Sequence, residues 1–261
     1  MNRMKRIIPC LDILGDGVVK GVQFRGLKNA GDPVELSSRY EKEGADEIAW
    51  LDIGATNSSR ETMFDRLRDT ASVLFIPLTA GGGLRSLEDV SRALGSGADK
   101  ISLNTAAVKN PDLVREVSEE FGSQCVVVSV DAAWNSRAHR YEVFTNSGTV
   151  ASGMDAIAWS RRVQDLGAGE ILLTSRDADG TGRGYDERLV SAVTSSLTIP
   201  VIASGGCGSI GDFISVLGKC GADAALAASV FHFGTLSIGQ VKRTLLSSGI
   251  EVRRSGGVEA E

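Results

Sequence analysis

The 261-residue chain has little histidine and little cysteine, with two and four residues respectively. With His139 and His232 as its imidazoles, a histidine-based zinc centre or a Ser-His-Asp hydrolase site has little support. The cysteines show no metal-ligand spacing, and Cys10 and Cys125 lie in apolar runs. We interpret them as buried thiols in a reducing compartment and expect a cytoplasmic protein. Because no dinucleotide-binding glycine motif follows the first strand, we predict no cofactor and no metal.

Long hydrophobic runs and an excess of positive charge are also missing. No apolar run approaches the roughly 20 residues of a membrane helix. The net charge is -5, whereas nucleic-acid-binding domains usually carry a basic face. The basic start MNRMKRIIPCLD has no long apolar region before a small-residue cleavage site, so we interpret it as the beginning of a strand and not as a signal peptide. We expect neither a membrane nor a nucleic acid as a partner.

Short apolar runs alternate with amphipathic segments along the chain. The expected strands are 6–11, 47–53, 75–80, 100–103, 125–130, 170–174, 200–203 and 224–227. The expected helices include 32–43, 86–95, 111–121, 156–166, 186–195 and 210–219. Nearly continuous apolar strands between helices are typical of a parallel sheet covered on both faces. Eight of them favour an α/β fold, the (β/α)8 TIM barrel, over a doubly wound open sheet. We expect one barrel domain over residues 1–253 and a disordered, glycine-rich tail over 254–261.

The two halves of the chain resemble each other at a nearly constant offset. The segment AGGGLRSL that begins at Ala80 matches ASGGCGSI at Ala203, and a Gly-Ala-Asp triplet recurs with a spacing of 124. Asp12 aligns with Asp131 at a spacing of 119. This repeat predicts two similar half-barrels, with the two aspartates at equivalent positions on strands that face each other.

Both aspartates follow apolar strands, at the end of the barrel where active sites of this fold lie. Asp12 and Asp131 should therefore project into the mouth. A lone aspartate at such a position can simply cap a turn or a helix, but a symmetric pair favours a catalytic role. Of two opposed carboxyl groups, one can act as general base and accept a proton while the other acts as general acid and donates one.

Glycine motifs after the third and seventh strands indicate the class of substrate. The loops that contain Gly83 and Gly206 let backbone N–H groups approach an anion closely. The next strand of each half ends in a residue pair with a hydroxyl group, which can complete each cradle. Two such cradles predict a substrate with a phosphate at each end and its reacting atoms between the aspartates.

Polar residues also close the second and sixth strands. Asp52 and Ser175 are repeat partners, and we expect both side chains in the mouth. An Asp- and Gly-rich loop follows Ser175. Such a loop is often merely a turn, but here the Gly180 amide is placed to fold over one phosphate.

These motifs together resemble the cyclase subunit of imidazole glycerol phosphate synthase. The segments that carry the resemblance are IIPCLDILGDGVVKGVQF, GADKISLNTAAV, FGSQCVVVSVDA, GAGEILLTS, GYD, IPVIASGG and GADAALAASVFHF, and it extends from about residue 6 to about residue 253. The half-barrel repeat also resembles the phosphoribosylformimino isomerase of the same histidine pathway. The length of the Asp131 segment and the run LAASVFH favour the cyclase.

The resemblance implies a lyase reaction of histidine biosynthesis. Ammonia adds to the ribulosyl carbonyl of phosphoribulosyl-formimino-aminoimidazole carboxamide ribonucleotide. Ring closure and cleavage then give imidazole glycerol phosphate and aminoimidazole carboxamide ribonucleotide. The family's catalytic acids fall on Asp12 and Asp131, and its loop-one lysine falls on Lys20, a cation that can close over substrate. Its phosphate-binding positions fall on Gly83, Asn104 and Thr105 at one end, and on Asp179, Gly180, Gly206, Ala228 and Ser229 at the other.

The resemblance further implies a heterodimer with a glutaminase (amidotransferase) subunit docked at the N-terminal face of the barrel. That subunit supplies ammonia through a gate of charged residues, which falls on Arg6, Glu47, Lys100 and Glu170. The alternative is a salt-bridge cluster that plugs the barrel, with two acids and two bases neutralising each other. Asp99 matches a family contact to the glutaminase.

Four residues depart from the family's pattern, namely Val18, Gly54, Ala133 and Ala178. A threonine is usual in place of Gly54, and basic residues are common at the other three. We therefore expect a weaker positive lining of the mouth. This leaves open a paralogous ammonia-dependent enzyme on another phosphorylated substrate, in amino-sugar or glycan synthesis. A third alternative is a catalytically silent barrel that activates a glutaminase, against which the intact aspartate pair argues.

Overall fold

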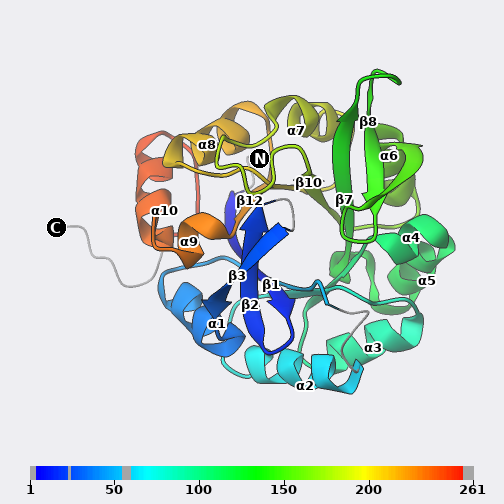
Figure 1. Cartoon of the computed structure of the whole chain (residues 1–261), viewed down its shortest axis with the longest axis horizontal. Coiled ribbons are helices and arrows are strands. Elements are labelled where there is room, and N and C mark those ends of the chain that lie inside the picture. Colours follow the sequence, from blue (N-terminus) through cyan, green and yellow to red (C-terminus); the bar gives the residue numbers. More distant parts are fainter. Residues whose placement is uncertain (1–3, 23–24, 55–59, 255–261) are drawn as a thin grey trace.

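The computed structural model describes residues 4–22, 25–54 and 60–254. Eight parallel strands form a closed barrel in the order β1-β4-β5-β6-β7-β10-β11-β12, and β12 pairs with β1 (Figure 1). These strands are β1 (Arg6–Leu14), β4 (Ile48–Asp52), β5 (Leu78–Gly81), β6 (Lys100–Leu103), β7 (Val126–Asn135), β10 (Glu170–Ser175), β11 (Val201–Ser204) and β12 (Ala224–Ala227). The predicted (β/α)8 barrel is confirmed. The open doubly wound sheet is wrong, because a closed ring of strands leaves no edge.

Helices form a ring around the barrel (Figure 1). They are α1 (Pro33–Lys42), α2 (Arg60–Ala71), α3 (Leu87–Gly95), α4 (Thr105–Lys109), α5 (Asp112–Phe121), α6 (Ala156–Asp165), α7 (Glu187–Thr194), α8 (Ile210–Ile214), α9 (Ser229–His232) and α10 (Ile238–Ser247), with a 3-10 turn at Ser123–Cys125 and a π-helical turn at Ser215–Lys219. Aspartate side chains cap the first turns of three helices. Asp32 accepts backbone N–H groups of α1, Asp155 accepts one of α6, and Asp186 accepts one of α7. Such caps satisfy donors that the helix itself leaves unpaired.

The barrel strands bury both of their faces. Ile7 packs in the core between strands and helices, while its neighbour Ile8 packs in a second cluster with Val127, Leu172 and Ile202. Both isoleucines are fully buried. Two-sided burial explains why the strands read as continuous apolar runs without polar alternation.

The predicted ends of two strands are wrong, because β1 and β7 continue past the aspartates. Each enters an antiparallel hairpin: β1 pairs with β2 (Gly17–Val22), which pairs with β3 (Arg25–Gly31), and β7 pairs with β8 (Arg140–Thr145), which pairs with β9 (Val150–Asp155). Asp12 lies opposite Val19, and Asp131 lies opposite Phe144. The hairpins contain polar and glycine residues, which suggest loops in the sequence, but the local antiparallel partner extends each strand beyond the parallel ladder.

A smaller error concerns β5, which begins at Leu78 and not at residue 75. Phe75 is 97% exposed, and Pro77 follows it. Because proline has no N–H to donate, the ladder starts after it. Residues 255–261 of the predicted tail lie outside the described residues. Within the described part of the chain, every helix is too short or too polar to cross a membrane.

Candidate active site

A cavity of about 1060 Å³ opens at the carboxyl ends of the barrel strands. Nearly all of the substrate-contacting residues predicted from the sequence line it: Asp12, Lys20, Asp52, Gly83, Asn104, Thr105, Asp131, Asp179, Gly180, Gly206, Ala228 and Ser229. They come from strands on all sides of the barrel, so closure of the sheet is what brings them together.

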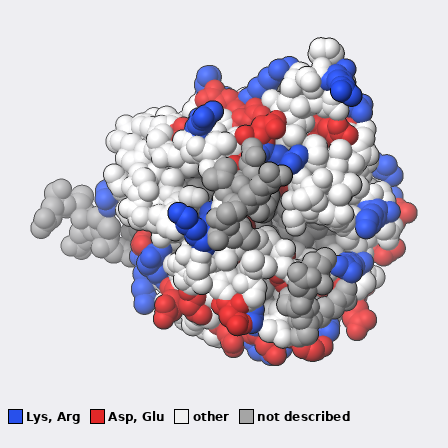
Figure 2. Space-filling view, in the orientation of Figure 1, with Lys and Arg blue, Asp and Glu red and all other residues white. Residues whose placement is uncertain are grey.

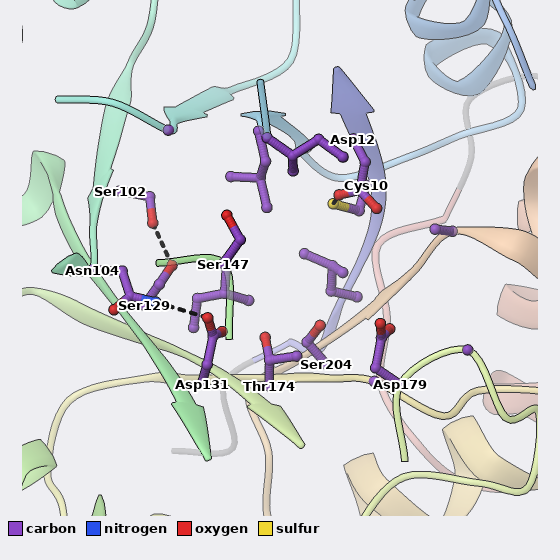
Figure 3. A pocket seen from close by; sticks show the side chains of 18 of the residues that line it. Cys10, Asp12, Ser102, Asn104, Ser129, Asp131, Ser147, Thr174, Asp179 and Ser204 are labelled. Atoms are coloured by element: carbon purple, nitrogen blue, oxygen red, sulfur yellow. Dashed lines mark hydrogen bonds between the residues drawn. The ribbon is translucent and has the colours of Figure 1, made fainter. Parts of the chain in front are cut away.

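Asp12 projects into this cavity from β1 (Figure 3) and forms an ion pair with Lys20. Its side chain is nearly buried, and Lys20 of the β1–β2 hairpin places Nζ 3.0 Å from Asp12 Oδ2. Lys20 Nζ also lies 3.4 Å from Asp179 Oδ1, in the loop after β10. Burial by itself lowers the pKa of Lys20, but the two carboxylates outweigh it and raise the pKa. Lys20 thus bridges one aspartate from each half of the barrel.

Asp131 projects from β7 on the other side of the cavity and has a neutral partner (Figure 3). Asn104 Nδ2 donates a hydrogen bond of 2.8 Å to Asp131 Oδ2. Burial is the largest influence on the pKa of Asp131 and raises it, the charges of Asp179 and Asp12 act in the same direction, and the Asn104 hydrogen bond and the Arg176 charge oppose them. The net pKa is about 7. A carboxyl group with a pKa near neutrality can both donate and accept a proton under physiological conditions.

Glycine loops flank the two aspartates, one in each half. Gly82 has φ +95°, and a Cβ there would lie 2.0 Å from the Asp52 carbonyl oxygen. Gly206 has φ +106°, and a Cβ there would lie 2.1 Å from the Gly184 carbonyl oxygen. A side chain at either position would therefore break the loop, and glycine is required for the backbone to approach the cavity. These loops are the parts of the mouth that can hold an anion through backbone N–H groups.

Two cations that the sequence did not single out also line the mouth. Arg85 follows the first glycine loop, and Lys109 lies on α4, both exposed and both on the side of Thr105. The predicted weakening of the positive lining is therefore offset at this end. Elsewhere on this face, Lys and Arg alternate with Asp and Glu around the rim (Figure 2). The signal for Arg85 was present, since it lies two residues after the triple glycine.

The prediction that Ser175 points into the mouth is wrong. Its hydroxyl group donates to Asp186 Oδ2 at 3.3 Å, at the start of α7, and it does not line the cavity. The neighbouring Thr174 lines the cavity instead, because successive side chains of a strand point to opposite faces. Asp52, the repeat partner of Ser175, does line it, and its Oδ1 accepts the Gly54 N–H. Burial raises the pKa of Asp52.

The floor of the cavity carries hydroxyl groups that the sequence prediction missed. Ser102 Oγ and Ser129 Oγ share a hydrogen bond of 2.6 Å between β6 and β7, and Ser204 faces the same space (Figure 3). In the sequence, serines inside apolar runs gave no signal, because burial does not distinguish a serine on the barrel interior from one on the outer face.

His232 lies outside the lining of the cavity. It is buried, and its Nδ1 lies 2.6 Å from the Tyr40 hydroxyl oxygen. Burial lowers the pKa of His232 to about 4, so the imidazole is neutral at physiological pH. Among residues 4–22, 25–54 and 60–254, no group of three or more His, Cys, Asp and Glu side chains is arranged to hold a metal ion.

At the opposite end of the barrel, the four residues predicted as a gate form one charged ring. Arg6 Nη1 and Lys100 Nζ each lie 2.8 Å from Glu47 Oε2, and Lys100 Nζ lies 3.0 Å from Glu170 Oε2. Arg6 also pairs with Glu170. Burial by itself raises the pKa of Glu170, but the two cations outweigh it and lower the pKa. Two acids and two bases thus neutralise each other across the barrel floor.

Asp99 lies beside this ring, and its carboxylate has a local structural use. Asp99 Oδ2 accepts the Leu78 N–H at 2.9 Å, where β5 begins. Its repeat partner Asp223 accepts the Val201 N–H at 3.1 Å, where β11 begins. The exposed Asp99 side chain lies at the amino end of the barrel, on the face where the sequence predicts a partner.

Comparisons with known proteins agree with this geometry. The model of the family described as histidine biosynthesis protein matches residues 6–237. Proteins named imidazole glycerol phosphate synthase subunit HisF are similar over 249 residues, which is 95% of this chain and 98% of each relative. Identity is 54% for the protein of Bacillus cereus (strain Q1), 55% for that of Clostridium botulinum (strain Okra / Type B1) and 57% for that of Sulfurisphaera tokodaii. The chain therefore belongs to the histidine biosynthesis protein family and, within it, to the HisF subunits of imidazole glycerol phosphate synthase.

Proposed function

We propose that this chain is the ammonia-using cyclase of imidazole glycerol phosphate synthase. Its substrate is phosphoribulosyl-formimino-aminoimidazole carboxamide ribonucleotide, and its products are imidazole glycerol phosphate and aminoimidazole carboxamide ribonucleotide. The observation that carries the proposal is the pair of buried carboxylates, Asp12 and Asp131, on opposite sides of a cavity between two glycine loops. A substrate with a phosphate at each end fits this arrangement, because its middle then lies between the acids.

The two phosphates take the two symmetric cradles. Gly83, Asn104 and Thr105 hold one phosphate, and the lining cations Arg85 and Lys109 attract it. Gly180, Gly206 and Ser229 hold the other, at the edge where Lys20 bridges Asp12 and Asp179. Holding the substrate at both ends orients the reacting carbon without any contact to the reacting atoms themselves.

The aspartates have different roles because their partners differ. Asp131, with a pKa of about 7, is the general acid: it protonates the ribulosyl carbonyl oxygen, which leaves as water when ammonia forms the imine. Asp12, a carboxylate paired with Lys20, is the general base that removes the excess proton from the attacking nitrogen. The imine nitrogen then closes the ring on the formimino carbon, and the aminoimidazole amine takes up a proton and leaves. Transfer of a proton from the ribulosyl CH2 next to the imine carbon to a ring nitrogen completes the aromatic imidazole.

We infer that the partner subunit docks at the amino end of the barrel, over the charged ring. A glutaminase docked there delivers ammonia beside Arg6, Glu47, Lys100 and Glu170, and the exposed Asp99 contributes to the contact. In this arrangement the ring must open for ammonia to enter the barrel. Lys100 contacts Glu47 and Glu170 through side-chain ion pairs, so a shift of its side chain would break two contacts of the ring.

The test is turnover by the purified chain with the proposed substrate and an ammonium salt at mildly alkaline pH. Loss of substrate and formation of both products are followed for the wild type, for Asp12→Asn and for Asp131→Asn. Asp69→Asn, an exposed aspartate on α2, is the matched control. We expect turnover by the wild type and the control and none by the two active-site variants.

A wild-type chain that binds this substrate but does not turn it over would contradict the cyclase proposal and favour a silent scaffold. Absence of binding would favour another phosphorylated substrate. Addition of the glutaminase subunit and glutamine, with glutamate release measured in parallel, distinguishes a missing partner from a silent barrel.

A further inference from the structure

The turn between β8 and β9 reaches into the mouth of the barrel. Asn146 and Ser147 at this turn line the cavity beside Thr105 and Lys109. The Ser147 side chain points into the cavity in Figure 3. Neither residue belongs to the motifs that the sequence singled out, and their role follows from the hairpin geometry.

The backbone of this turn is strained. Asn146 has φ 52° and Ser147 has φ 53°, so two consecutive residues other than glycine adopt the left-handed conformation, followed by Gly148 with φ 74°. Asparagine tolerates this conformation, but serine does so less readily. Turn geometry alone would favour glycine at position 147. Residues held in such conformations cluster at ligand sites, where the surrounding structure stabilises them.

One hydrogen bond joins the turn to the barrel, and an arginine side chain lies on its other side. The Asn146 N–H donates to Thr105 Oγ1 at 2.9 Å. On the other side, the Arg176 side chain lies beside Gly148, so close that an added Cβ at Gly148 would come within 3.0 Å of Arg176 Cδ, and the Arg176 guanidinium lies 4.2 Å from the centre of the Phe144 ring. The turn is therefore clamped between α4 and the loop after β10.

The hydrogen bond from Asn146 also sets the direction in which the Thr105 hydroxyl group donates. Because Thr105 Oγ1 accepts the Asn146 N–H, its own proton is left to donate to another acceptor. The Ser147 hydroxyl group, also able to donate, lines the same end of the cavity as the cations Arg85 and Lys109. Two hydroxyl donors beside two cations and a glycine loop form an environment for a phosphate dianion.

We propose that Ser147 is a further ligand of the phosphate group that binds beside Gly83 and Thr105. The strained turn keeps the Ser147 hydroxyl group at the rim before substrate arrives, so binding requires no reordering of the hairpin. This inference rests on the proposed function for the identity of the phosphorylated substrate. The phosphate site itself does not depend on it.

The test uses Ser147→Ala and Ser147→Gly, with Ser152→Ala on β9 as the matched control. The Ser152 hydroxyl group donates to the Val143 carbonyl within the same hairpin, outside the cavity lining. Ammonia-dependent turnover should show a KM about tenfold higher for both Ser147 variants, the loss expected for a hydrogen bond to a charged group, with kcat within about twofold of wild type. Ser147→Gly should at the same time raise Tm, because glycine relieves the left-handed strain.

A purely structural role for Ser147 makes a different prediction. In that case Ser147→Gly would raise Tm and leave KM at the wild-type value, which would overturn the inference while the cyclase proposal stands. Calorimetric titration with inorganic phosphate separates the inference about Ser147 from the cyclase proposal. If the wild type lacks cyclase turnover but one of two phosphate sites weakens about tenfold in Ser147→Ala, the inference holds and the proposed function fails. Equal phosphate binding by wild type and Ser147→Ala, or none by either, overturns the inference.

Discussion

Asp12 and Asp131 occupy equivalent positions in the two half-barrels but have different neighbours. Each lies where a parallel strand continues into an antiparallel hairpin, opposite Val19 and Phe144. In the first half, Lys20 of the hairpin forms an ion pair with Asp12. In the second half the partner is the amide of Asn104, which follows β6, and burial raises the pKa of Asp131 to about 7. The repeated scaffold places two acids face to face, and the local partner gives each its role.

The floor of the barrel shows the same division between symmetry and local difference. Glu47 and Glu170 are repeat partners, so each half provides one acid to the ring. Both cations, Arg6 and Lys100, come from the first half. The second half has Cys125 and Ala224 at the equivalent positions. At both ends of the barrel, therefore, the carboxylates follow the repeat and the cations break it.

The largest effects should come from removing either aspartate. Asp12→Asn and Asp131→Asn should each reduce ammonia-dependent turnover at least about 100-fold, since each removes one side of the proton transfer. Their stabilities should change in opposite directions at pH 8. Asp12→Asn removes the ion pair with Lys20 and lowers Tm. Asp131→Asn removes a carboxylate whose ionisation the fold disfavours and raises Tm.

The predicted rise in Tm of Asp131→Asn follows from the raised pKa of Asp131. An aspartate has an ordinary pKa of about 3.9, and the folded protein holds Asp131 at about 7. The stabilising contribution of its protonated form is complete below the ordinary pKa and is lost as pH rises through 7. The Tm advantage of Asp131→Asn should therefore grow between pH 5 and pH 8 in thermal unfolding scans. An advantage that does not vary with pH would contradict the assigned environment.

Removal of the bridging cation should have the next largest effect. Lys20→Met leaves the nearly buried carboxylates of Asp12 and Asp179 without the cation between them. We expect a fall in turnover of roughly 10- to 100-fold and a loss of Tm that is greater at pH 8 than at pH 5, because carboxylates repel each other only when ionised. Lys28→Met, on the exposed part of β3, is the control and should match the wild type. Full activity in Lys20→Met would show that the first half does not need its cation.

A change in the floor ring should affect stability more than chemistry. Lys100→Met leaves Glu47 and Glu170 with Arg6 as the remaining cation of the ring. Because Lys100 is partly exposed, we expect the free energy of unfolding to fall by about 1–3 kcal/mol, less than for a fully buried pair. Urea unfolding of the wild type and of Lys100→Met measures this change in the free energy of unfolding. Turnover with ammonium salt should stay within about threefold of wild type, whereas glutamine-dependent turnover with the partner subunit should change more. Equal changes in the two rates would argue against a gate.

Removal of the amide partner of Asp131, which also belongs to one phosphate cradle, should change the pH dependence of the reaction more than kcat. Asn104→Ala removes a hydrogen bond that lowers the pKa of Asp131, so that pKa should rise above its wild-type value. In a pH–rate profile measured at constant free ammonia, the limb assigned to Asp131 should move to higher pH, with kcat at its optimum changed only a few-fold. A shift to lower pH would reverse the assigned effect of the amide.

The barrel and the opposed aspartates were predictable because each follows from a strong local pattern. Two-sided burial turns strands into continuous apolar runs, and the repeat relates Asp12 to Asp131 without any structure. The hairpins after these residues were not predictable, since their polar and glycine-rich sequence also suits loops. Ser175 was misplaced by one residue along β10, and such a shift moves a side chain to the opposite face. Ser147 gave no signal, because its position in the mouth depends on contacts with Thr105 and Arg176 far away in the sequence.

The most direct test of the division between the two acids is their titration in the folded protein. The chain labelled with 13C at the aspartate carboxyl carbons is followed by NMR from pH 4 to pH 9, alongside Asp131→Asn and Asp12→Asn. We predict one carboxyl resonance that titrates near pH 7, that is absent from Asp131→Asn and present in Asp12→Asn. If Asp131 titrated below pH 5, in the same range as an ordinary carboxyl group, the two half-barrels would carry equivalent acids and the assignment of general acid and general base would be wrong.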